Sequence, residues 1–180
     1  MTDSTADPPA AAPTGSAAAP PRRDAPATSR EYGGARPNIV GVHLYLRRED
    51  GRILLGLRHP DVAYAGGSHH FLAGHCEDEG ALGALIREAE EEAGLTIAAE
   101  DVELVHTVHV LHPGAGGPPR MQLVFRAHAW SGVPEIREPD KCLEWSWHDP
   151  GALPEPIVPY ARAAIEAIGR GEAYSEMGRQ

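Results

Sequence analysis

The amino-acid sequence predicts an α+β domain in which strands and two helices form layers. Three observations support this class: several segments alternate apolar with other residues, short turn and loop segments separate them, and two segments carry apolar residues at helical spacing. At 180 residues the chain is long enough for one domain with a sizeable core and short for two. No internal repeat is visible.

Composition divides the chain into three regions. Residues 1–37 contain ten Ala and seven Pro, so this segment can bury little apolar surface and its prolines oppose regular pairing. We therefore predict a disordered N-terminal extension. The domain itself is expected over residues 38–172, and a C-terminal tail over 173–180.

The strand predictions depend on alternation and on turn residues. Strands are expected at 38–48, 52–58, 69–73, 102–111, 120–130 and 142–149. The first two are expected to form a hairpin, because Asp50-Gly51 is typical of a tight turn between paired strands. The strands at 102–111 and 120–130 are expected to be antiparallel partners.

Two helices are expected, one acidic and one that closes the domain. In residues 81–93 the apolar side chains fall within one arc of about 100° and would face the core. These core-facing residues are Leu82, Leu85, Ile86, Ala89 and Ala93. Gly94 can adopt the left-handed conformation that ends a helix. The second helix is expected over 157–170.

Glu88, Glu91 and Glu92 fall on an arc beside this apolar stripe, because offsets of three and four residues bring helical side chains together. Like charges at this spacing destabilise a helix by roughly a few tenths of a kcal/mol per pair. One interpretation is an ordinary acidic surface. The other is that Mg²⁺ or Mn²⁺ removes the repulsion, since hard cations prefer oxygen ligands and keep open positions for substrate phosphates.

The overall charge and composition exclude several classes of function. A net charge of −10 argues against sequence-independent binding to nucleic acid, which needs a basic surface. No apolar run is long enough to suggest a membrane span, and the N-terminus lacks the apolar core of a secretory signal. Two cysteines give no disulfide framework, so a reducing cytoplasm is the expected location.

The acidic stretch resembles the signature of the Nudix hydrolases, G-x5-E-x7-R-E-U-x-E-E-x-G-U, where U is apolar. From Glu79 onward every defined position matches: seven residues, Arg87-Glu88, Ala89, one residue, Glu91-Glu92, one residue, then Gly94-Leu95. Gly74 precedes Glu79 by four residues instead of five, so a tighter loop is expected. The resemblance covers about residues 38–170 and implies the Nudix α/β/α sandwich, with a mixed sheet between helices.

The resemblance also implies roles for individual residues. The metal-binding carboxylates would be Glu88, Glu91 and Glu92, with the Gly74 carbonyl as a further ligand. Arg87 is expected to pair with a nearby carboxylate, most simply Glu79, and to hold the helical acids in place. Glu91 or Glu88 is expected to accept the proton of the attacking water.

A further metal ligand or base is expected from a distant loop. Glu138 is the best candidate, because it lies in IREPDKCLEW, which resembles the E-P-x-K-C-x-x-W stretch of Nudix enzymes acting on nucleoside triphosphates and other nucleotide diphosphates. Glu135 and Asp140 are possible substitutes. Arg58 is a weaker candidate for contact with a substrate phosphate.

The activity that the resemblance implies is Mg²⁺-dependent hydrolysis of a diphosphate linked to a further group, with Mn²⁺ as a possible substitute. The substrate would be a small molecule: a nucleoside triphosphate, a nucleotide sugar or a biosynthetic diphosphate. The alternative is a non-catalytic Nudix module that binds a nucleotide as a sensor. A homodimer is possible, since dimers are common in the proteins that this chain resembles.

Overall fold

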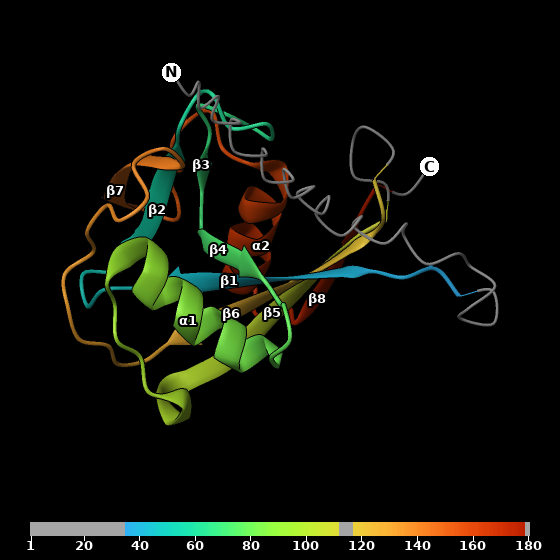
Figure 1. Cartoon of the computed structure of the whole chain (residues 1–180), viewed down its shortest axis with the longest axis horizontal. Helices are drawn as coiled ribbons and strands as arrows, with labels where there is room; N and C mark the ends of the chain where they lie inside the picture. The colour runs from blue at the N-terminus through green and yellow to red at the C-terminus, as the bar shows by residue number, and fades with distance from the viewer. Residues whose placement is uncertain (1–34, 112–116, 179–180) are drawn as a thin grey trace, which may run out of the picture.

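The computed structural model describes residues 35–111 and 117–178, so the extension predicted over 1–37 lies almost entirely outside the described residues. A five-stranded mixed sheet forms the centre, in the order β4-β1-β6-β5-β8. Its strands are β1 (Ile39–Leu46), β4 (Leu72–His75), β5 (Val102–Val110), β6 (Arg120–Ala127) and β8 (Tyr174–Met177). β1 pairs antiparallel with β4 and parallel with β6, which makes the sheet mixed (Figure 1). The antiparallel pairing predicted between β5 and β6 is confirmed.

A second sheet of three strands has the order β3-β2-β7. It contains β2 (Ile53–Arg58), β3 (His69–His70) and β7 (Cys142–His148). The predicted hairpin of β1 with β2 is therefore wrong beyond its turn. Gly51 has φ 87° and a single bridge joins Arg47 to Ile53, but the two strands then enter different sheets. Both edges of β1 are already occupied by β4 and β6, which leaves no place for β2.

The helix α1 (Ala81–Ala93) covers one face of the central sheet. Alternate β1 residues on that face, including Val42 and Leu44, share a core with Leu85 and Ala89 of the helix. The buried stripe contains Ala84 where the sequence predicted Leu82, which is 36% exposed. As predicted, Gly94 ends the helix in the left-handed conformation, with φ 67°.

The helix α2 (Pro159–Gly169) packs on the opposite face. Tyr45, the β1 residue between Leu44 and Leu46, points to that side and shares a second core with Val124, Ala161 and Ile165. Successive residues of a strand point to opposite faces, so β1 contributes to both cores and the molecule has three layers. The α/β/α sandwich with a mixed sheet, predicted from the sequence, is confirmed.

The described structure continues past the boundary expected at residue 172. β8 pairs in parallel with β5, from Thr107 with Tyr174 to Val110 with Met177. A short 3₁₀ turn, η1 (Ala99–Asp101), precedes β5. No helix in the described part of the chain is both long and apolar enough to cross a membrane.

Candidate active site

The loop between β4 and α1 is tied to the helix by the guanidinium of Arg87. Arg87 Nη2 donates to Glu79 Oε1 at 2.9 Å and to the carbonyl oxygen of His75 at 3.2 Å. Arg87 therefore makes the contact with Glu79 that the sequence predicted, although the loop is one residue shorter than the family signature. The guanidinium lowers the pKa of the Glu79 carboxyl mainly through this hydrogen bond.

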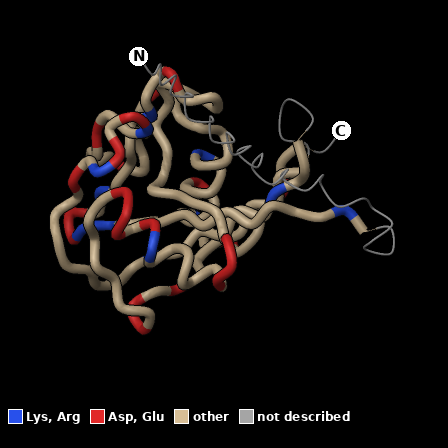
Figure 2. Tube along the Cα trace, in the orientation of Figure 1, with Lys and Arg blue, Asp and Glu red and all other residues tan. Residues whose placement is uncertain are grey.

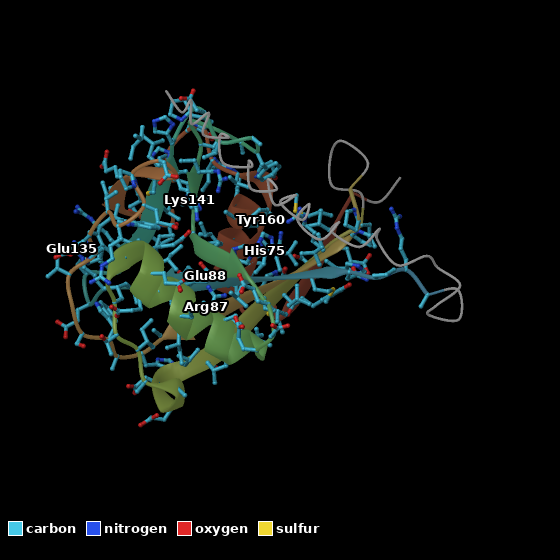
Figure 3. All side chains as sticks on the ribbon, viewed as in Figure 1. His75, Arg87, Glu88, Glu135, Lys141 and Tyr160 are labelled. Carbon is cyan, nitrogen blue, oxygen red and sulfur yellow. The ribbon has the colours of Figure 1, made fainter. Side chains whose placement is uncertain are left out.

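The same guanidinium contacts two glutamates of the helix. Arg87 Nη1 donates to Glu88 Oε1 at 2.8 Å and to Glu91 Oε2 at 2.9 Å. The contacts with Glu79, Glu88 and Glu91 all raise the pKa of Arg87, which stays charged. Figure 2 shows acidic positions along α1 with basic positions beside them, and Figure 3 shows Arg87 and Glu88 next to each other on the helix. One cation thus holds three carboxylates in a fixed arrangement.

Gly74 lies directly against the carboxylate of Glu88. A Cβ atom at Gly74 would come within 2.0 Å of the Glu88 carboxyl carbon and 2.1 Å of Oε1. Only glycine lets the β4 backbone approach the carboxylate this closely. The residue whose carbonyl was predicted as a metal ligand is therefore adjacent to a predicted carboxylate ligand.

Glu92 is a partly buried member of the predicted ligand set, and the pKa of its carboxyl is strongly shifted. Burial raises the pKa of its carboxyl to about 7, and the negative charges of Glu88 and Glu138 act in the same direction. One of its oxygens accepts a hydrogen bond from the backbone N–H of Ala73 at 3.2 Å. Glu92 therefore interacts electrostatically with both Glu88 and Glu138, although Glu138 is 46 positions away in the chain.

Glu138 lies in a turn that also presents a lysine. Its carbonyl oxygen accepts from the N–H groups of Lys141 and Cys142, and Lys141 Nζ donates to its carboxylate at 2.7 Å. The carboxylates of Glu138, Glu92 and Glu88 all raise the pKa of Lys141, so its ammonium stays charged beside the acidic cluster. In Figure 3, Glu88 lies between the labels of Arg87 and Lys141. The chain thus supplies two cations of its own to this cluster.

The two substitutes considered for Glu138 lie elsewhere or point to solvent. Glu135 is beside the C-terminal end of α1, where its N–H donates to the carbonyl of Ala93 at 3.1 Å (Figure 3). Asp140 is exposed and next to Lys141 in the chain. Of the three acids considered for this role, only Glu138 is among the groups whose charge acts on Glu92.

Sequence reasoning missed the contact that docks this loop on the helix. Arg137 Nη1 donates to the carbonyl oxygen of Glu90 at 2.9 Å and to its Oε1 at 2.8 Å. The Glu90 carbonyl lies at the C-terminal end of α1, where it also accepts from the N–H of Gly94, and a cation is favoured at that end of a helix. The Arg137 side chain also lies where a Cβ at Gly94 would be, within 2.7 Å of Nη2. Arg137 therefore fixes the neighbouring Glu138 next to α1.

The side chains of this cluster offer the kind of ligand atom that a hard divalent cation binds. Carboxylate oxygens are the ligands that Mg²⁺ prefers. Burial is the main cause of the raised pKa of Glu92, and the repulsion from Glu88 and Glu138 that adds to it is what a bound cation would relieve. Within the described residues, no group of three or more His, Cys, Asp or Glu side chains is arranged to hold a metal ion. The contacts above explain this, because Glu88 and Glu91 turn to Arg87, and Glu138 turns to Lys141.

A cavity of about 440 Å³ lies beside Gly74. Its polar side chains were not predicted from the sequence, apart from Arg58. The wall is built by β4, β1, β6, the end of β2 and the loop after it, the first turn of α2 and the end of β8. It includes Ala73, Gly74, His75, His43, Gln122, Arg58, Arg120, Tyr64, Tyr160 and Met177. Cavities of this size hold small organic ligands, and aromatic walls are typical of them.

Burial favours the neutral form of the two histidines in the cavity wall. Burial lowers the pKa of His43 to about 4, and burial together with Arg120 lowers that of His75. Arg120 Nη1 lies 3.1 Å from His75 Nε2, which accepts its hydrogen bond. Arg58 Nε donates to the carbonyl oxygen of Tyr64 at 2.9 Å. The wall thus combines two guanidinium groups with aromatic rings and neutral imidazoles.

The chain matches known proteins over nearly all of its described length. The sequence profile of the NUDIX domain matches residues 37–168. A MutT NUDIX hydrolase from Burkholderia pseudomallei is 30% identical with a TM-score of 0.64, and the match covers 72% of this chain and 97% of that one. No curated protein matches significantly.

Two further solved structures are similar to the chain. The ORF135 protein of E. coli is 26% identical with a TM-score of 0.63, over 76% of this chain and 92% of that one. An ADP-ribose pyrophosphatase from Streptococcus suis is 18% identical with a TM-score of 0.53, over 78% of this chain and 98% of that one. At that identity the second likeness shows the shared fold alone.

Proposed function

The chain belongs to the Nudix family of pyrophosphohydrolases, and on that premise we propose that it is a Mg²⁺-dependent hydrolase of nucleoside diphosphates linked to a further group. The observation that carries the proposal is the juxtaposition of three carboxylates with a cavity. Glu88 and Glu138 both act electrostatically on Glu92, and Gly74 both contacts Glu88 and lines the cavity. A diphosphate whose organic part occupied the cavity would have its phosphates next to the carboxylates.

We assign the cation to Glu88, Glu91, Glu92 and Glu138, with the carbonyl of Gly74 beside them. Bound Mg²⁺ supplies charge neutralisation at the phosphates and lowers the pKa of coordinated water. Arg87 and Lys141 are the chain's own counterions to these acids, and they hold the carboxylates in place in the absence of metal. Mn²⁺ has the same ligand preference and is a possible substitute.

We assign to Glu91 or Glu88 the role of the general base that accepts the proton of the attacking water. A general base must reach that proton at hydrogen-bond distance, and both side chains lie on the face of α1 held by Arg87. Glu91 is the more exposed, with 56% of its side chain accessible against 15% for Glu88. A water molecule therefore has easier access to Glu91.

The organic part of the substrate is proposed to be a nucleoside. A nucleobase is flat, and Tyr64 and Tyr160 supply aromatic surface to the cavity. Arg58 and Arg120 provide positive charge in the same wall for a phosphate or a polar base edge. Nucleoside triphosphates and nucleotide sugars both satisfy these requirements, and small cytoplasmic nucleotides are the proposed substrates rather than nucleic acid.

A panel of substrates tests the proposal. ATP, dGTP, an oxidised dGTP, ADP-ribose and a UDP-sugar are each incubated with the protein, with Mg²⁺ or with EDTA, and released phosphate and pyrophosphate are measured. If the protein is an enzyme, it should turn over at least one substrate of the panel with Mg²⁺, and this turnover should stop in EDTA. Tight binding without turnover would instead establish the alternative, a nucleotide sensor.

The variant Glu91→Gln separates the assigned acids from the general acidity of the chain. It should lose at least about two orders of magnitude in rate on the best substrate of the panel and keep the fold. The matched control is Glu100→Gln, which removes one exposed carboxylate in η1 and should leave the rate unchanged. A Glu91→Gln variant as fast as the parent would contradict the assignment.

A further inference from the structure

Two polar side chains of the cavity wall form a buried pair. His43 of β1 and Gln122 of β6 lie on adjacent parallel strands, and His43 Nε2 is 2.9 Å from Gln122 Oε1. Gly41 makes room for this contact, because a Cβ there would come within 2.2 Å of Gln122 Oε1. Both side chains are at least 96% buried. The surrounding side chains therefore hold the pair in place, and solvent has almost no access to it.

The direction of this hydrogen bond follows from the second nitrogen of the ring. His43 Nδ1 is buried and has no hydrogen-bond partner among the described residues. If His43 Nε2 accepted from the Gln122 amide, the neutral ring would carry its proton on Nδ1, leaving a buried N–H without an acceptor. Buried N–H groups without a partner are rarer than unpaired acceptors. His43 Nε2 therefore donates, and Nδ1 carries a lone pair.

This assignment determines what Gln122 presents to a ligand. Its carbonyl oxygen is occupied by His43, so its amide NH₂ is left for the cavity, which Gln122 lines. The other polar side chains nearby add donors of the same kind, since the guanidinium groups of Arg58 and Arg120 have no acceptor atoms. The hydroxyls of Tyr64 and Tyr160 can donate or accept a hydrogen bond, so they do not distinguish donor groups from acceptor groups on a ligand.

We propose that this donor-lined wall selects nucleobases by an edge of hydrogen-bond acceptors, and that His43 is the positioning residue that turns the Gln122 amide toward the ligand. The inference depends on the proposed function only in taking the ligand to be a nucleotide. A 6-oxopurine offers two adjacent acceptors, O6 and N7, to guanidinium and amide donors. Adenine instead presents an amine at position 6, which would face N–H groups and lose its hydrogen bond.

Binding of a matched pair of nucleotides tests the selectivity without any hydrolysis. Inosine 5′-monophosphate and adenosine 5′-monophosphate share their ribose and phosphate and differ at positions 6 and 1 of the purine. Their dissociation constants are measured by calorimetry in EDTA. The parent protein should bind the 6-oxo nucleotide about tenfold more tightly, the effect of roughly one well-placed hydrogen bond.

Two variants separate the role of the pair from simple damage to the cavity. Gln122→Glu keeps the shape but replaces the amide NH₂ with an acceptor oxygen, so the preference should reverse toward adenosine monophosphate. His43→Phe frees the Gln122 amide to turn either way, so the ratio of the two constants should fall toward one. Thermal melting of each variant checks the fold, and the ratio is compared only for folded proteins.

Equal binding of the two nucleotides by the parent would overturn the proposal, and so would a Gln122→Glu variant with an unchanged ratio. Absence of binding by both nucleotides would overturn it as well. The outcome of the hydrolysis panel is independent of this binding experiment. Selective binding without turnover on any substrate would reject the proposed enzyme and leave the donor-lined wall intact.

Discussion

Replacing Gly74 by Ala should separate catalysis from folding in this protein. The new Cβ would lie 2.0 Å from the carboxyl carbon of Glu88, so this carboxylate would have to move by about 1.4 Å to reach an ordinary contact of 3.4 Å. That movement would break the 2.8 Å hydrogen bond from Arg87 Nη1. A displacement of about 1 Å at a reacting group can cost about 100-fold in rate, and we expect a loss of at least that size.

The same substitution should change stability little. The atoms that the methyl group meets belong to the end of one flexible side chain and not to backbone. We expect a cost of about 1 kcal/mol or less, which corresponds to a fall in melting temperature of less than about 5 °C. The control is Gly80→Ala, because a Cβ at Gly80 meets nothing within 4 Å and its φ is −72°.

The assay combines initial rates on the best substrate, at saturating Mg²⁺, with thermal melting of the parent and both variants. We expect a large loss of rate in Gly74→Ala and parental behaviour in Gly80→Ala. A Gly74→Ala protein that melts normally and keeps its rate within twofold would show that the position of Glu88 does not matter for catalysis.

Two further predictions concern the charges of the cluster. The metal-free protein should lose about 3 kcal/mol of stability as the pH rises from about 4.5 to about 7, because the folded state holds the proton of Glu92, whose pKa is about 7, more tightly than the unfolded chain does. In Glu92→Gln, the free energy of unfolding, measured with urea in EDTA across that pH range, should lack this loss. If the free energies of unfolding of the two proteins changed in parallel with pH, a contribution from Glu92 would be excluded. Lys141→Met should tighten Mn²⁺ binding by about two- to fivefold, because Lys141 competes for Glu138 at 2.7 Å and is largely exposed. Weaker binding in a titration followed by electron paramagnetic resonance would show instead that Lys141 supports the site.

Local patterns in the sequence predict the part of the structure that local physics decides. The acidic helix has the predicted bounds, 81–93, because its apolar spacing and the glycine that ends it lie within one short segment. The contact between Arg87 and Glu79 spans only eight positions. The prediction of a hairpin between β1 and β2 is wrong because several strands compete to pair with β1. The turn favours β2, but β4 and β6 take both edges of β1.

The cavity could not be predicted in this way. His43 and Gln122 are 79 positions apart and meet through a parallel pairing, which no turn residue signals. Arg137 resembles any charged loop residue until the loop folds against α1. The resemblance to a family supplied Glu138 as a candidate, but its proximity to Glu92 depends on that docking. Long-range contacts of this kind carry no local periodicity.

The proposed chemistry requires that the glutamates of α1 bind a divalent ion, and a titration with Mn²⁺ followed by electron paramagnetic resonance measures this binding. We expect saturable binding at or below millimolar Mn²⁺ by the parent protein, competition by Mg²⁺, and loss of binding in a variant with Gln at positions 88, 91 and 92. Equal spectra for the parent and the triple variant would show that these glutamates hold no ion and would leave α1 as an acidic surface helix.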